Sequence, residues 1–264
     1  MPKVKRTEEE RRAREGIEFI ESLDRGLRVL QSFATDRRPM TLSDLAKVSN
    51  LPRATTRRIL MTLQKAGFVS GDERLFALTP RVLLLATAYL TSNQISTVMQ
   101  PLMDEVSAKA KEVCSLAILD SDEVVFIARS SPARIFSMGL DIGYRLPAFC
   151  TSVGRVLLSR LSNDELAKTI GDMKLVAQTP ETLTDKAAVI ATIIADRTKG
   201  YSLVDREGEA GFRSISVPVR RYDNAVIAAA NIGAHVDRIT TGEMIDRFLP
   251  LLKELSETAR PLLV

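Results

Sequence analysis

The fold is decided by the stretch 41-TLSDLAKVSNLPRATTRRILMTLQKAGFV-69. Thr41 is followed three residues later by Asp44, which predicts a relaxed capping box at the start of a short amphipathic helix over 42–48. The sequence Ser-Asn-Leu then predicts a turn, and a proline suits the first position of a second helix over 52–66. Two helices joined by so short a turn are typical of a helix-turn-helix.

The segments on either side complete a small domain. Upstream, apolar residues in steps of three and four predict a helix with one buried stripe, formed by Ile20, Leu23, Leu27, Leu30 and Phe33. Downstream, two short apolar runs at 68–70 and 75–78 surround a polar turn and predict a hairpin. We therefore expect a winged helix-turn-helix domain over 20–79, preceded by a mobile charged arm over 1–19.

The outer face of the second helix predicts contact with DNA. Thr56, Ile59, Leu60 and Leu63 form its apolar stripe, which leaves a basic face for the major groove. Arginine suits phosphate and the guanine edge, and threonine can contact a thymine methyl group. The expected DNA-binding residues are Thr41, Ser43, Arg53, Thr55, Arg57, Arg58 and Arg74, the last at the hairpin tip. The alternatives are a merely solvated surface for the arginines and capping for Thr41 and Ser43.

Charge is unevenly distributed along the chain. Residues 1–79 carry 16 Lys and Arg against 11 Asp and Glu, whereas residues 80–264 carry 21 against 22. The net charge of +4 therefore comes from the first third of the chain. A basic excess confined to one domain indicates that this domain meets a polyanion, if the protein meets one at all.

Beyond the hairpin, the sequence predicts a linker helix over 80–93 and a second domain over 94–264. The run 82-VLLLATAYL-90 is apolar around its whole circumference, so it packs either against a second copy or against its own domain. Strand-like and helical runs alternate from residue 97 onward, with several strands adjacent in sequence, a further strand expected over 135–140 and a closing helix expected over 241–260. This mixture of helices and sequence-adjacent strands predicts an α+β domain built on a largely antiparallel sheet.

Composition excludes several classes of function. The only histidine is His235, so a multi-histidine metal site cannot be built, and we expect neither a metal nor a cofactor. The sequence contains no GxxxxGK[ST], HExxH or GxSxG motif. Two cysteines without a CxxC pair favour a reducing compartment. No apolar run approaches 20 residues and no signal peptide is recognisable, so we expect a cytoplasmic protein without a membrane partner.

Two other functions remain open. Cys150 stands at a predicted helix start, where a thiol pKa can fall, and it would be a nucleophile if His235 reached it as a base. In the other alternative, the protein binds DNA and its C-terminal domain only mediates oligomerisation.

Three segments carry a resemblance to a known family. SLDRGLRVLQSF with TLSDLAKVSNLPRATTRRILMTLQKAGFV resembles the DNA-binding domain of IclR-type bacterial regulators. LPAFCTSVGRVLLS and GYSLVDREGEAGFRSISVPV resemble the effector-binding domain of the same family. Within the family, these segments most resemble regulators of aromatic-acid catabolism, those of the protocatechuate, 4-hydroxybenzoate and β-ketoadipate pathways. The resemblance implies a GAF-like C-terminal domain that binds a small organic acid, dimers or tetramers on operator DNA, and RNA polymerase as a further partner.

The resemblance also implies a set of ligand contacts. The matching positions are Met138, Leu146, Ser152, Val153, Phe212, Ser214, Asn231 and Gly233, with an acidic contact at or beside Asp205. The helix start at Thr151 would supply N–H groups and hydroxyls, and Phe149 would complete an apolar wall. Arg129 or Arg134 would pair with a carboxylate or form surface salt bridges. Phe212 suits a flat aromatic acid, which could stack on its ring.

Overall fold

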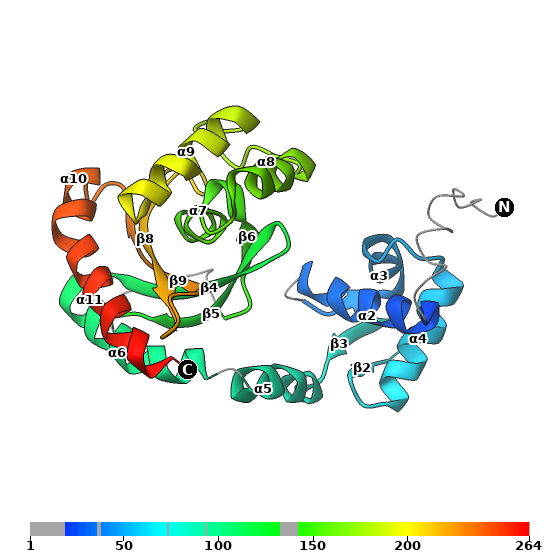
Figure 1. Ribbon diagram of the computed structural model, residues 1–264. Coiled ribbons are helices and arrows are strands. Elements are labelled where there is room, and N and C mark those ends of the chain that lie inside the picture. Colours follow the sequence, from blue (N-terminus) through cyan, green and yellow to red (C-terminus); the bar gives the residue numbers. More distant parts are fainter. Residues whose placement is uncertain (1–18, 36–37, 73, 93, 133–141, 264) are drawn as a thin grey trace. The chain divides into compact units, whose positions relative to one another are not determined.

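The computed structural model describes residues 19–35, 38–72, 74–92, 94–132 and 142–263, and the chain divides into two compact units between Tyr89 and Leu90 (Figure 1). The predicted arm and the predicted strand over 135–140 lie outside the described residues, apart from Phe19 at the end of the arm.

The first unit is a winged helix-turn-helix, as predicted. Its elements are α2 (Glu21–Ser32), β1 (Met40–Thr41), α3 (Leu42–Val48), α4 (Arg53–Lys65), β2 (Val69–Gly71) and β3 (Leu75–Leu78). The strands pair antiparallel in the order β1-β3-β2, so the hairpin gains a third, two-residue strand that the sequence did not predict. Val29, Leu45, Leu60 and Phe76 form the centre of the core.

The capping box before α3 is confirmed in detail. The Thr41 backbone N–H donates to Asp44 Oδ2 at 3.2 Å, and the Asp44 N–H donates to Thr41 Oγ1 at 3.2 Å. Both groups would otherwise lack a partner at the helix start.

The predicted buried stripe of α2 is wrong in its first half. Ile20, Leu23 and Leu27 are exposed, whereas Val29 and Phe33 enter the core. The core includes residues from the C-terminal part of α2 only, whereas Leu23 and Leu27 line a groove between α2 and α4. The regular apolar spacing predicted the helix correctly, but it could not predict which of the apolar residues are covered by other elements.

The segment after the wing begins with a 3₁₀ turn, η2 (Pro80–Val82), and continues as α5 (Leu83–Ser92). Leu83, Leu84 and Leu85 are exposed, so this part of the helix is not packed against its own domain, which was one of the two alternatives.

The second unit is built on one fully antiparallel six-stranded sheet with the order β6-β5-β4-β9-β8-β7. The strands are β4 (Val113–Asp120), β5 (Glu123–Ser130), β6 (Arg145–Pro147), β7 (Ser202–Asp205), β8 (Phe212–Arg220) and β9 (Val226–His235). The helices are α6 (Ile95–Ala110), α7 (Ser152–Leu158), α8 (Asn163–Asp172), α9 (Lys186–Lys199), α10 (Thr241–Glu243) and α11 (Leu249–Ala259). This arrangement confirms the α+β prediction.

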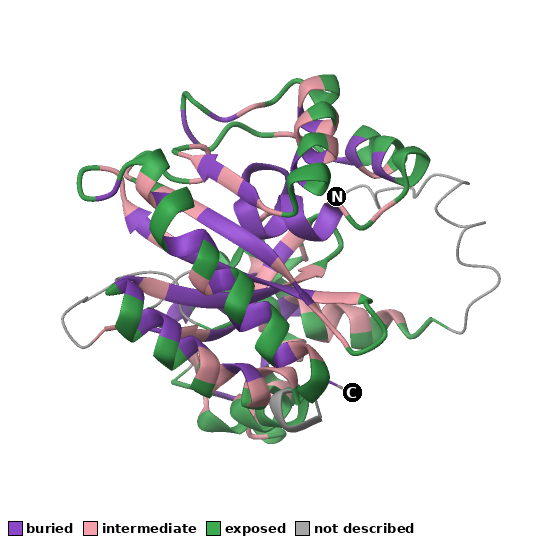
Figure 2. Ribbon diagram, turned by 60° about the vertical axis from the view of Figure 1, so that its left-hand side comes forward, coloured by how far each residue is buried: buried purple, intermediate pink, exposed green. Residues whose placement is uncertain are grey.

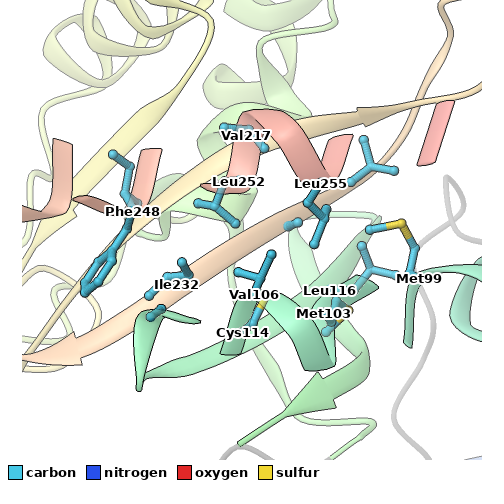
Figure 3. Close-up of a cluster of buried hydrophobic side chains, with 14 of the residues drawn as sticks. Met99, Met103, Val106, Cys114, Leu116, Val217, Ile232, Phe248, Leu252 and Leu255 are labelled. Atoms are coloured by element: carbon cyan, nitrogen blue, oxygen red, sulfur yellow. The ribbon is translucent and has the colours of Figure 1, made fainter. Parts of the chain in front are cut away.

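Helices cover both faces of this sheet. On one face, α6 and α11 bury a core that includes Met99, Met103, Leu116, Phe248 and Leu252 (Figure 3). On the other face, α7 packs between the sheet and α9 and belongs to a second core. Figure 2 shows that burial is concentrated in the strands, while the outer sides of the helices are exposed.

Three features of this unit depart from the predicted elements. The short strands β6 and β7 form the two edges of the sheet and were not predicted. The closing helix expected over 241–260 is interrupted by a π-helical segment, Met244–Phe248. Pro250 explains the interruption, because it has no N–H for the carbonyl four residues back and its ring would clash there.

Candidate nucleic-acid interface and ligand site

The basic side chains of α4 divide between two faces. Arg53 and Arg57 are both exposed and lie four residues apart, so they are neighbours on one outer face. Arg58 is also exposed, but with Thr55 it lines a groove between α4 and α2, of about 760 Å³, together with Leu23, Leu27 and Met61. The four residues predicted to share one DNA-facing surface are therefore only partly brought together.

In the wing, Arg74 lies next to an Asp72 side chain that accepts backbone hydrogen bonds. The Asp72 carboxylate accepts the backbone N–H groups of Arg74 and Leu75, both at 3.1 Å. These two hydrogen bonds lower the pKa of Asp72. Arg74 is exposed beside this turn. Near α3, the Thr41 hydroxyl donates to Asp44 at 2.6 Å and is occupied by capping, whereas Ser43 is exposed.

In the second unit, the side chains at the start of α7 have different roles. The Thr151 hydroxyl caps the helix by accepting the Gly154 N–H at 3.2 Å, and it donates to the Pro147 carbonyl at 3.2 Å. Ser152, fully buried, shares a hydrogen bond of 2.8 Å with Ser214 of β8. This bond joins α7 to the sheet and identifies the face of β8 that α7 covers.

The described residues leave space on this face of the sheet beside that bond. Gly233 of β9 pairs directly with Ser214, so both residues lie on the same face. A Cβ built at Gly233 meets no atom of the described residues within 4 Å. A glycine inside a strand often marks a place where a ligand approaches the backbone. Asn231 lies two residues along the same strand and therefore faces the same side.

The apolar residues predicted for the site have mixed positions. Phe149 and Val153 are almost fully buried and Leu146 half-buried, all within or against the core beneath α7. Phe212 is 41% exposed and makes an edge contact with the ring of His235, with centroids 5.6 Å apart. Met138 and Arg134 lie outside the described residues.

Asp205 is not brought to this site. In β7 it pairs with Arg213, next to Ser214 in β8, so its side chain lies on the opposite face of the sheet. There, Arg213 Nε lies 3.0 Å from Asp205 Oδ1, and Arg213 also donates to the Ile239 carbonyl at 2.9 Å. The sequence motif left the position of the acidic contact uncertain by one residue. The strand register determines that Asp205 lies on the opposite face.

A buried ion pair next to the site was not predicted. Arg155 of α7 donates to Glu207 at 2.7 Å and to the Phe149 carbonyl at 2.8 Å. Glu207 also accepts the Leu183 N–H at 3.0 Å, and Thr182 donates to the Glu207 carbonyl at 2.6 Å. These contacts fasten the β7–β8 loop over the start of α7. The motif containing Glu207 was recognisable, but its partner is 52 residues away in the sequence.

Cys150 is fully buried, which argues against a nucleophilic role. Burial raises the pKa of its thiol to about 11, and the Glu207 charge acts in the same direction. A nucleophilic cysteine requires the opposite shift. Among the described residues, no group of three or more His, Cys, Asp or Glu side chains is placed to hold a metal ion, and no helix is long and apolar enough to cross a membrane.

Two family models match the chain. The model of the IclR helix-turn-helix domain matches residues 22–73, and that of the bacterial transcriptional regulator IclR C-terminal domain matches residues 87–260. Among curated proteins, the Pca regulon regulatory protein of Pseudomonas putida is 40% identical, covering 89% of this chain and 81% of its own length. The p-hydroxybenzoate hydroxylase transcriptional activator of Acinetobacter baylyi is 34% identical, covering 93% and 92%.

Solved structures agree in fold. An IclR homologue from Microbacterium hydrocarbonoxydans, complexed with 4-hydroxybenzoate, has a TM-score of 0.74 and 26% identity, covering 91% of this chain and 98% of its own. A double mutant of the PobR inducer-binding domain from Acinetobacter, complexed with 3-hydroxybenzoic acid, has a TM-score of 0.61 and 34% identity, covering 64% and 98%. The chain belongs to the IclR family of bacterial transcriptional regulators.

Proposed function

We propose that this DNA-binding regulator responds to a hydroxylated aromatic acid and controls genes for the breakdown of such acids. Relatives are named for the Pca regulon and for p-hydroxybenzoate hydroxylase, and two solved relatives hold hydroxybenzoates. In this chain, the supporting observation is the space over Gly233 that no described residue fills, bordered by the Ser152–Ser214 hydrogen bond and by Asn231. Space bordered by a few polar groups suits a ligand of this size.

The proposed contacts follow from this placement. Ser152, Ser214 and Asn231 supply polar groups, and Gly233 supplies room. Leu146 and Val153 contribute the apolar wall, with Phe149 behind them, and Phe212 lies at the exposed margin. Thr151 supports the site through the cap of α7 rather than through its hydroxyl.

The regulator acts as a dimer or tetramer in this proposal. Leu83, Leu84 and Leu85 of α5 expose an apolar surface that a second copy can bury. Two winged domains would then read half-sites separated by about 34–36 Å or a multiple of that distance. Effector binding would change operator affinity by about 5–150-fold, the usual range for coupled sites.

Calorimetry on the full-length protein tests the effector class. The probes are 4-hydroxybenzoate, protocatechuate, gentisate and β-ketoadipate, and the same acids are added to gel-shift assays on the upstream DNA of neighbouring catabolic genes. We expect at least one hydroxylated aromatic acid to bind and to change the DNA affinity. If none of the four acids bound, the result would favour the alternative in which the second domain only mediates oligomerisation.

Substitution of Arg57 tests the nucleic-acid interface. Arg57→Ala removes an exposed cation from α4, so operator affinity should fall. The slope of log K for operator binding against log salt concentration should become shallower by about one. Arg160→Ala, which removes an exposed cation from the second unit, is the matched control and should leave both unchanged. An Arg57→Ala protein with normal operator affinity would show that the recognition face lies elsewhere.

A further inference from the structure

We propose that Thr79 and Arg81 fix the orientation of the basic helix α4 relative to the linker helix α5, and thereby determine which spacing of operator half-sites the regulator accepts. Both are positioning residues, because they act through α4 rather than through contacts with the bases. The inference rests on the dimer of the proposed function, but it does not depend on which effector the protein binds.

The Thr79 side chain connects the end of α4 to the start of the linker. Its hydroxyl donates to the Gly67 carbonyl at 2.5 Å and accepts the Arg81 N–H at 3.3 Å. The Thr79 backbone N–H donates to the Phe68 carbonyl at 2.9 Å. Gly67 and Phe68 follow closely on α4, which ends at Lys65. Two hydrogen bonds from one residue therefore hold the end of α4, and a third continues to the first turn of the linker.

Arg81 adds a second contact at the same place. Its guanidinium carbon lies over the Phe68 ring, 5.7 Å from the ring centre, and a cation over an aromatic face is attracted to it. A Cβ built at Gly67 would lie only 3.2 Å from Arg81 Nη1, so the arginine also lies against this glycine. Arg81 thus holds the first turn of the linker against the residues that follow α4. We call these four residues, Gly67, Phe68, Thr79 and Arg81, the joint.

The backbone on the linker side of the joint is restricted. Pro80 follows Thr79, and a residue before proline is confined to extended conformations; Thr79 has φ −95° and ψ 164°. Pro80 begins the 3₁₀ turn η2, which continues directly into α5. On the other side, the Gln64 side chain donates to the Gly71 carbonyl at 3.1 Å and fastens the wing to α4. Strand β3 of the wing leads through the joint into α5 (Figure 1), so α4, the wing and the start of the linker form one connected block.

Such a block makes operator spacing a strict requirement. One base pair added between two half-sites moves one of them by about 3.4 Å along the DNA and turns it by about 35°. If the α5 helices of two copies pair as proposed, each α4 keeps its angle to that pair and does not follow the displaced half-site. A looser joint would let α4 follow, so the loss of affinity at altered spacing would shrink.

Gel-shift assays on the full-length protein test the role of Thr79. The DNA set contains one operator, versions with one base pair added or removed between the half-sites, and a fragment with a single half-site. The measured quantity is the spacing penalty, which is the ratio of the affinity at native spacing to that at altered spacing. Thr79→Val removes the hydroxyl but keeps the side-chain volume. Its spacing penalty should be about 2–10-fold smaller than that of the wild type, from the usual worth of one hydrogen bond.

Two comparisons separate positioning from a general loss of structure. Thr79→Ser keeps the hydroxyl and should restore the wild-type spacing penalty, and the affinity of Thr79→Val for the single half-site should remain unchanged. Thr62→Val is the matched control, because the Thr62 hydroxyl donates to the Arg58 carbonyl at 3.0 Å within α4. This control should leave the spacing penalty at the wild-type value.

Arg81 has its own comparison. Arg81→Met removes the cation from the Phe68 ring and should reduce the spacing penalty, whereas Arg81→Lys should retain most of it. The penalty is the correct measure here, since loss of a phosphate contact would lower the affinity at both spacings equally. The melting temperature reports whether each variant is folded, and the two Arg81 variants provide the test if Thr79→Val does not fold.

The possible results are distinguishable. An unchanged spacing penalty in Thr79→Val and Arg81→Met, or an equal reduction in Thr62→Val, would overturn the inference. A wild type that tolerates altered spacing would also overturn it, because α4 would then already follow the displaced half-site. A wild type that sediments as a monomer contradicts the dimer of the proposed function and this inference with it. A wild type that responds to no aromatic acid contradicts the proposed effector alone.

Discussion

Removal of Glu207 tests whether the β7–β8 loop is fastened by its buried ion pair. The Arg155 side chain is 3% exposed and that of Glu207 is 13% exposed, so water screens the pair very little. Glu207→Ala deletes the acceptor for Arg155 and for the Leu183 N–H, at 2.7 and 3.0 Å. The arginine keeps its hydrogen bond to the Phe149 carbonyl, but its charge remains buried without a counterion.

The expected loss of stability is large for a single substitution. Breaking a buried pair by removing one partner costs about 3–5 kcal/mol, because the remaining charge is left uncompensated. At roughly 2–4 °C per kcal/mol for a unit of this size, the melting temperature of the second unit should fall by about 6–20 °C. Replacing both partners, as in Arg155→Met with Glu207→Leu, should recover most of this loss, since no buried charge remains.

Scanning calorimetry of the four proteins measures these differences, with Glu123→Ala as the control. Glu123 pairs with Arg145 at 2.6 Å, but both side chains are about 40% exposed, so its removal should cost about 1 kcal/mol or less. If Glu207→Ala proved no more harmful than Glu123→Ala, or if the double variant were less stable than the single one, the ion pair would not be what holds the loop.

Three further outcomes follow from local geometry. Gly154→Ala should lower stability by about 1–3 kcal/mol in denaturant unfolding, because a Cβ there would overlap the Ala148 backbone. Asp223, whose pKa is held at about 2 by hydrogen bonds from Arg221 and the Ala225 N–H, stabilises the fold above its ordinary pKa of 3.8, and that contribution is lost as the pH falls toward 2. Unfolding curves of Asp223→Asn should therefore depend less on pH over this interval. Cys150, with a thiol pKa of about 11, should react with iodoacetamide at pH 8 only after denaturant is added; rapid labelling of the folded protein would contradict its burial.

Local signals were sufficient for the first unit and most of the second. The capping box of Thr41, the turn and the basic helix are each specified by residues a few positions apart, so the sequence displays them directly. Local sequence did not predict that Leu23 and Leu27 are exposed. Periodicity identifies which residues share a helix face, but only the packing of α2 on α4 determines which part of that face is covered.

The ligand site shows a different limit. Its candidate residues come from α7, β8 and β9, and the resemblance could place Ser152, Ser214 and Asn231 there only because the family motifs include them. Asp205 belongs to the same kind of motif, yet strand pairing turns it to the other face beside Arg213. One step of register reverses the direction of a side chain, and no local pattern reports that step.

The same dependence on register explains why a polar row across the sheet escaped prediction. It is formed by the paired residues Arg129, Ser115, Asn231 and Ser216. Ser115 and Ser216 are unremarkable in sequence, since each is a single serine inside an apolar strand, and Arg129 looks like the exposed end of another strand. Only the strand order places these residues side by side. Because β9 lies between β4 and β8, residues more than 80 positions apart in the sequence form one line across the sheet. Within the part of the chain that the structure describes, the Asn231 side-chain oxygen in that line has no hydrogen-bond partner, and a Cβ at the nearby Gly233 would meet no atom within 4 Å.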